Sequence, residues 1–257
     1  MVLKAKKNKA CSSCSVHWVF WVFFIYPVFL YGTVESKKKL MFHFDKIEVR
    51  GDLQVFVEPS KRNREVEYFA SSDIIDSVQA KVKGRTLFLE ANNTFDLSRR
   101  IPLIRISAKR VFPVEVMVSI ESLKEVRLHD QSNLVVKKIK GDEILLFSNS
   151  SGTLLTESIK YPVIKVRHEG SGAIILKGRE TQVLEANVYN QGELKCEELF
   201  LNRAKINHYG SGNLYLAPEE WLDLNFQGPG NITLLEQPEG SVINKSEQAG
   251  KLIEAFK

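Results

Sequence analysis

The residues of this sequence best suited to binding a ligand recur at a fixed spacing. They are polar or aromatic side chains three residues before a recurring glycine or its equivalent: His129, Asn149, Glu169, Tyr189, Tyr209 and Gln227. If successive members lie on strands about 4.8 Å apart, the rings of Tyr189 and Tyr209 can stack and present an apolar face with hydroxyl tips. Sugar rings and partner side chains bind to such a platform. The candidate binding surface is therefore Tyr189, Tyr209, Asn149 and Glu169, with a ladder that only stabilises the fold as the alternative.

Two histidines and two cysteines could bind a metal, but their spacing does not favour a shared site. His168 and His208 occupy the same place in the repeat with Val188 between them, which puts them two strands, or about 9.6 Å, apart. A single ion does not join ligands at that separation. Cys11 and Cys14 form a C-x-x-C pair that lacks a second ligand pair. The sequence therefore predicts no metal ligand and no cofactor-binding residue.

The acidic residues do not form the arrangements that polysaccharide-acting enzymes need. A glycosidase uses two carboxylates that face one cleft, and a lyase uses a base beside cationic groups. Here the carboxylates are scattered among expected turns; examples are Asp130, Glu169, Glu193 and Glu219. We therefore predict no catalytic residue.

Five glycines recur beside the candidate surface, namely Gly152, Gly172, Gly192, Gly212 and Gly230. A glycine-rich loop binds phosphate when a helix follows it, and here apolar strands follow instead. We therefore expect structural corners at which each glycine adopts a positive φ.

The element that positions these residues is a repeat in the second half of the chain. Aliphatic residues recur at intervals of 20, 20, 20, 20 and 18, at Leu134, Leu154, Ile174, Leu194, Leu214 and Ile232. A second set follows two residues later, at Val136, Thr156, Leu176, Cys196, Leu216 and Leu234. Spacing by two is typical of a strand with one face inward, and pairs such as Ile144 and Leu146 give each unit a second strand. The fixed period indicates a β-solenoid, in which Cys196 is a buried, unreactive thiol.

The rest of the chain divides around this repeat, which occupies residues 129–236. Residues 41–128 also favour strands, expected at 46–49, 53–57, 66–70, 86–89, 104–108 and 114–119. In the tail, residues 237–257, the spacing of Leu252, Ile253 and Phe256 predicts a short amphipathic helix that caps the last coil.

Residues 1–40 have the pattern of an export segment. A basic start precedes an apolar run from Val16 to Tyr31, which extends to Val34. The run can be a cleaved signal, which would leave a secreted protein, or a tilted anchor over residues 16–34 in the inner membrane. Three lysines directly after a possible cleavage site at 34–36 favour the anchor, and the flanking charges place the body outside the cytoplasm.

The net charge of +5 does not indicate a nucleic-acid partner. Residues 1–40 hold 7 of the 36 basic residues and 1 of the 31 acidic ones, which leaves 29 and 30 in the remainder. Because phosphate binding needs lysine and arginine clustered on a folded face, the neutral body argues against nucleic acid.

Three stretches carry a resemblance to a known family. They are the opening at 44–55, the passage from 114 to 134, and the Gly-Ser-Gly corners at 170–172 and 210–212. Through them, residues 42–235 resemble the bacterial head GIN domain, also called the auto-transporter adhesin domain. The resemblance implies an exported, right-handed parallel β-helical protein, for which the family has no agreed molecular activity.

These features predict an all-β protein, a right-handed parallel β-helix with coils of about 20 residues, preceded by a β-rich N-terminal half. We expect a non-enzymatic, adhesin-like envelope protein that binds an envelope glycan or protein and contacts the membrane through its N-terminal segment. A polysaccharide-acting β-helix enzyme and a scaffold that self-assembles through its open ends are the alternatives. The oligomeric state is left open.

Overall fold

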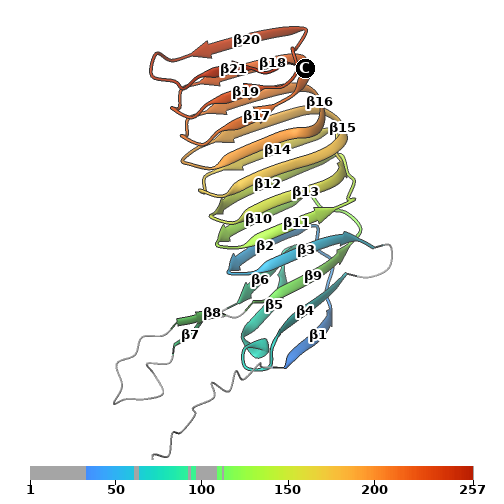
Figure 1. Cartoon of the computed structure of the whole chain (residues 1–257). Helices are drawn as coiled ribbons and strands as arrows, with labels where there is room; N and C mark the ends of the chain where they lie inside the picture. Colours follow the sequence, from blue (N-terminus) through green and yellow to red (C-terminus); the bar gives the residue numbers. More distant parts are fainter. Residues whose placement is uncertain (1–32, 61–63, 92–93, 97–108, 112, 257) are drawn as a thin grey trace, which may run out of the picture. The chain divides into compact units, whose positions relative to one another are not determined.

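The computed structural model describes residues 33–60, 64–91, 94–96, 109–111 and 113–256. Their regular elements are strands, apart from one 3-10 turn, η1 (Ile75–Ser77). The strands stack into a β-solenoid of about 6 turns (Figure 1). The predicted fold class and coil length of about 20 residues are therefore confirmed.

Each coil contains two strands. One set ends at the corner formed by the recurring glycines: β2 (Lys46–Gly51), β10 (Glu125–Asp130), β12 (Glu143–Ser150), β14 (Val163–His168), β18 (Pro218–Phe226), β20 (Gly240–Lys245) and the second halves of β15 (Ala173–Val188) and β16 (Glu193–His208). The other set begins at that corner: β3 (Gln54–Pro59), β11 (Asn133–Lys137), β13 (Thr153–Lys160), β17 (Leu214–Leu216), β19 (Ile232–Leu234), β21 (Leu252–Glu254) and the first halves of β15 and β16. Neighbours in each set pair in parallel at the predicted register, as Leu134 with Leu154 and Leu154 with Ile174.

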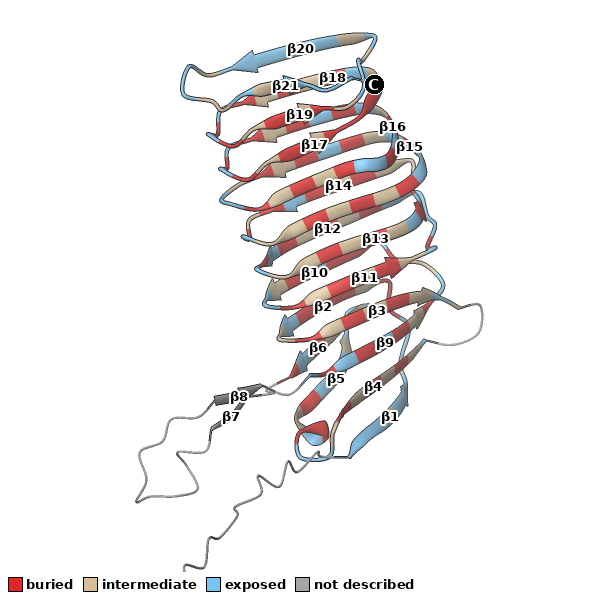
Figure 2. Cartoon of the chain, viewed as in Figure 1, coloured by how far each residue is buried: buried red, intermediate tan, exposed pale blue. Residues whose placement is uncertain are grey.

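The predicted inward columns form the core. The six residues of the first column, which begins at Leu134 and ends at Ile232, are each exposed by 3% or less. The same is true of the six residues of the second column, from Val136 to Leu234. Buried residues alternate with intermediate or exposed ones along the strands in Figure 2, as period-2 packing requires. Cys196 is fully buried in this core, and its burial raises the pKa of the thiol, so the thiolate needed for reaction is suppressed.

The parallel stack extends beyond residues 129–236 in both directions. At the N-terminal side, β2 pairs with β10 and β3 pairs with β11, so the first half of the chain supplies coils of its own. Below them lie β6 (Thr86–Ala91) and β9 (Glu115–Ile120), and an antiparallel layer follows: β1 (Val34–Leu40) on β4 (Glu65–Ser71), β4 on β9, and β5 (Val78–Lys83) on β6. A separate hairpin joins β7 (Thr94–Asp96) and β8 (Lys109–Val111).

The first-half strands predicted from the sequence have counterparts in β2, β3, β4, β6 and β9. The expected strand at 104–108 lies outside the described residues. Strands β1 and β5 were not predicted: β1 (VESKKKL) is mostly polar, and the regular alternation of β5 (VQAKVK) was not used as a signal.

The predicted capping helix in the tail is wrong. Residues 240–245 and 252–254 form β20 and β21, which add a further coil in parallel on β18 and β19. Leu252 lies opposite Ile232 and continues its column. The strand prevails because it satisfies backbone groups at the edge of β19, as in the bond from the Ile232 N–H to the Lys251 carbonyl (2.9 Å).

The basic and apolar start of the chain, residues 1–32, lies outside the described residues. The last residue of the expected 16–34 span, Val34, begins strand β1. Among the residues that the structure describes, no helix is long and apolar enough to cross a membrane.

Candidate functional site

The glycine corner, the row of turns around Gly152, Gly172, Gly192, Gly212 and Gly230, is built differently from the sequence-based expectation. None of these five glycines has a positive φ, so that prediction is wrong. A Cβ at Gly172 would lie less than 3.0 Å from the carbonyl oxygen of Gly152, and one at Gly212 would meet Gly192 in the same way. At four of the five positions glycine is required because successive turns touch backbone to backbone, while a Cβ at Gly192 would collide with the buried ring of His168.

The left-handed conformation at this corner belongs to other residues. Asp130 has a φ of 58° and Asn190 a φ of 56°. Both residue types tolerate this region because their short side chains bond locally. The Asp130 carboxylate accepts a hydrogen bond from the Gly51 N–H (2.9 Å), and the Asn190 amide donates to the Glu169 carbonyl. Asp130 therefore has a structural role in the turn.

A groove of about 620 Å³ runs along the glycine corner and crosses several coils. Its lining is mostly small and polar, and includes the predicted residues Asn149, Glu169 and Tyr209 together with Ser171, Asn190 and Gln191. Hydroxyls, amides and one carboxylate therefore face the same open channel. Such groups donate to and accept from the hydroxyls of a saccharide.

Tyr189 and Tyr209 stack at the side of this groove. Their ring centroids are 5.3 Å apart and the ring planes differ by 11°, so the predicted adjacency is confirmed. Tyr209 is 40% exposed, while Tyr189 is half-buried with the Arg167 guanidinium 5.8 Å from its ring centroid. The carboxylate of Glu169 pairs with Arg167 at 2.5 Å. The stack thus places one partly exposed tyrosine ring beside the polar groove.

A ladder of asparagines holds the tyrosine stack in place. Asn207 donates to Asn187 at 2.9 Å, and Asn225 donates to Asn207 at 3.3 Å. Asn225 also lies 3.4 Å from the hydroxyl oxygen of Tyr209 and accepts a bond from Gln227 at 3.1 Å. The intervals of 20 and 18 between these asparagines were visible in the sequence but were not used as a signal.

The remaining members of the predicted column do not line the groove. His129 contacts Phe147 with ring centroids 5.6 Å apart and lies 3.7 Å from the Glu48 carboxylate. Gln227 donates a hydrogen bond to Asn225, which in turn lies beside Tyr209. The structure therefore assembles Asn149, Glu169 and Tyr209 on the groove, adds Tyr189 through the stack, and leaves His129 apart.

Both repeat histidines are core residues. Val188 lies between His168 and His208 in the parallel register, as predicted. The ring of His168 contacts the carbonyls of Gly172 (3.0 Å) and Ser148 (3.3 Å). Its burial lowers its pKa, which keeps the imidazole neutral at pH 7.

Three of the acidic residues singled out in the sequence have separate partners in the structure. Glu169 pairs with Arg167, Glu193 pairs with Lys195 at 2.8 Å, and Asp130 binds the Gly51 backbone. In the described ranges, no group of three His, Cys, Asp or Glu side chains is placed to hold a metal ion. The groove has the chemistry of a binding surface.

Comparison with known proteins gives the family. The family model described as "Putative auto-transporter adhesin, head GIN domain" matches residues 43–238. The chain belongs to the head GIN family. A search of curated protein sequences finds no match.

Solved structures at low sequence identity share the fold. A "putative adhesin" from Bacteroides fragilis is 17% identical, with a TM-score of 0.73 over 86% of this chain and 96% of its own. A "putative lipid binding protein" from Parabacteroides distasonis is 18% identical, with a TM-score of 0.62 over 88% and 96%. A "putative adhesin" from Parabacteroides merdae is 19% identical, with a TM-score of 0.55 over 88% and 95%.

Proposed function

We propose that this head GIN protein is an exported, non-enzymatic component of the cell envelope that binds an envelope saccharide at the glycine corner. The observation that carries the proposal is the stacked pair Tyr189 and Tyr209 beside a groove lined by hydroxyls and amides. The family and several related structures carry the name "putative adhesin", which is consistent with a binding role.

The chemistry of the groove matches a sugar better than an apolar ligand. A pyranose presents C–H groups on one face and hydroxyls around its rim. The exposed face of Tyr209 can receive the C–H face, and Asn149, Asn190 and Glu169 can bond the rim. Because the groove crosses several coils, an extended chain of sugars can contact successive turns.

The sequence of the first 40 residues supports export. The basic start and the apolar run precede a body without net basic charge. The segment acts either as an inner-membrane anchor or as a cleaved signal, and both place the solenoid outside the cytoplasm.

The enzyme alternative has less support. Parallel β-helices can host enzymes that act on polysaccharides, but fold alone does not imply function. The carboxylates at the glycine corner are engaged in separate interactions with Arg167 and the Gly51 backbone. Two carboxylates that converge on one bond are what hydrolysis requires.

Retention on isolated cell envelopes, peptidoglycan sacculi and purified capsular polysaccharide tests the proposal. The full-length protein should be retained on at least one of these materials, and the Tyr189→Ala/Tyr209→Ala double variant should lose that retention. Tyr215→Ala is the matched control, because Tyr215 lies on β17 beside Lys195 and outside the groove. Unchanged retention of a folded double variant would rule out the tyrosine platform.

A further inference from the structure

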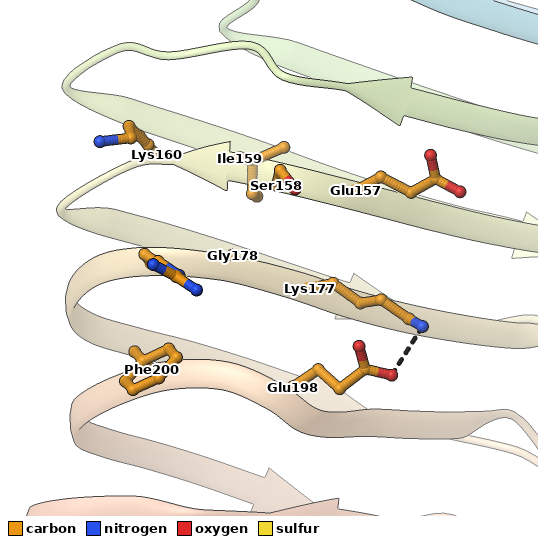
Figure 3. A pocket seen from close by; sticks show the side chains of 9 residues that line it. Glu157, Ser158, Ile159, Lys160, Lys177, Gly178, Glu198 and Phe200 are labelled. Atoms are coloured by element: carbon orange, nitrogen blue, oxygen red, sulfur yellow. Dashed lines mark ion pairs between the residues drawn. The ribbon is translucent and has the colours of Figure 1, made fainter.

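A second concave site lies at the corner where β13 and the first halves of β15 and β16 end. The cavity has a volume of about 550 Å³ and is shown in Figure 3. Lys160 and Phe200 lie at one end of it, while Glu157 and Glu198 lie at the other. Nothing in the groove at the glycine corner depends on these residues.

The cationic end of this cavity holds an aromatic ring and a guanidinium in contact. The Arg179 guanidinium carbon lies 5.5 Å from the centroid of the Phe200 ring. Phe200 is 58% exposed, so its ring is accessible to a ligand. A guanidinium at cation–π distance from a ring can still donate N–H groups to a planar anion.

Arg179 is the cation of the cavity without a carboxylate partner in the described part of the chain. Lys177 pairs with Glu198 at 2.6 Å, and Lys160 pairs with Glu180. The charges of both lysines are therefore largely balanced, whereas that of Arg179 is available to a ligand.

The backbone fixes the floor of the cavity. A Cβ at Gly178 would lie less than 3.0 Å from the Ile159 carbonyl, so the two chains touch there. Ser158 has a φ of 54°, a conformation that non-glycine residues adopt at a cost. The pairing of β15 with β16 shifts register on both sides of Gly178. These features give a preformed recess at this corner.

We propose that this cavity binds a carboxylated saccharide, such as a uronic acid residue. The carboxylate accepts a pair of hydrogen bonds from the N–H edge of Arg179, and the sugar ring lies against Phe200. Glu157 and Glu198 accept bonds from sugar hydroxyls at the other end. An acidic peptide such as poly-glutamate lacks these hydroxyls, so the site favours an acidic saccharide.

Calorimetric titration of the full-length protein with tetragalacturonate and with a hyaluronan tetrasaccharide tests this site. At least one should bind, while neutral maltotetraose should bind more weakly. Arg179→Gln should weaken binding by about tenfold or more, because the paired hydrogen bonds are lost. Arg179→Lys should not restore it, because a point charge does not reproduce the planar fork. Phe200→Leu, which keeps apolar volume but removes the ring, should weaken binding several-fold.

Two controls separate this site from others. Arg203→Gln changes an exposed arginine that already pairs with Glu220, at 3.1 Å, and should leave binding unchanged. The Tyr189→Ala/Tyr209→Ala variant should also bind normally, whatever its effect at the glycine corner. The proposal is overturned if the wild-type protein binds neither acidic oligosaccharide, or if Arg179→Gln binds as the wild type does. Equal binding of poly-glutamate, lost in Arg179→Gln, would show an acidic-peptide site instead.

Discussion

His208 is an ionisable side chain placed in the core between Val188 and Phe226. Neither ring nitrogen has a hydrogen-bond partner among the described residues, and the ring stacks on Phe226 with centroids 5.5 Å apart. Burial lowers its pKa from 6.5 to about 4, and the nearby Gly230 backbone opposes the shift without forming a well-directed bond. The folded state therefore resists protonation that the unfolded state accepts.

This asymmetry predicts acid sensitivity. Stability contributed by neutral His208 is complete above pH 6.5 and is lost as the pH falls towards 4, at about 1.4 kcal/mol per pH unit. The His208→Leu variant should therefore have a flatter dependence of unfolding free energy on pH over this range, measured by urea denaturation. His43→Gln, at an exposed position, is the control. Parallel pH profiles for wild type and His208→Leu would contradict the prediction.

The corner glycines make a second prediction at the residue scale. At position 172 the Gly152 carbonyl leaves no space for a Cβ, and φ is not positive. Gly172→Ala should therefore lower the free energy of unfolding by about 1–3 kcal/mol. Gly172→Asn should be no better, although asparagine tolerates a positive φ. Ser171→Ala, at an exposed position of the same turn, should change little. A fully stable Gly172→Ala protein would show that the turns are not in backbone contact.

At the scale of the strand, the inward columns determine stability. Ile174 is fully buried between Leu154 and Leu194, so Ile174→Asp places an unpaired carboxylate in the core and should cost more than ~3 kcal/mol. Ile175→Asp, one residue further on the outward face, should cost much less. Thermal unfolding of the two variants measures the difference. If both melt like the parent, the register of the columns is wrong.

The strands also show which features a fixed period can predict. The columns from Leu134 and Val136 follow it because core packing repeats once per coil. The contact between Arg179 and Phe200 was not predicted, because the pairing there shifts and residue 178 lies opposite 199 instead of 198. The tail failed for a related reason: three apolar residues, Leu252, Ile253 and Phe256, fit a helix, while the edge left by β19 selects a strand.

At the scale of the whole molecule, the sequence predicted the solenoid and the tyrosine stack, since both depend on the same repeat. It did not predict the groove beside the stack, because a groove depends on how corners of different residue types lie relative to one another. The sequence analysis also explained the corner glycines by a positive φ, whereas the structure explains them by close contact between turns. A glycine in the sequence looks the same in both cases.

The proposed export of the protein is open to a direct test. If the N-terminal segment exports the solenoid as proposed, alkaline phosphatase fused to the C-terminus should be active in cells. The same fusion with β-galactosidase should be inactive. The reverse pair of activities would contradict export.

Binding of the full-length protein to an array of bacterial envelope saccharides tests the central claim most directly. The wild-type protein should bind at least one class of saccharide. The Tyr189→Ala/Tyr209→Ala variant, folded and with a similar melting temperature, should bind that saccharide at least about tenfold more weakly. If the wild-type protein binds no saccharide on the array, or if the double variant binds the same saccharides with unchanged intensity, the glycine corner is not a saccharide-binding site.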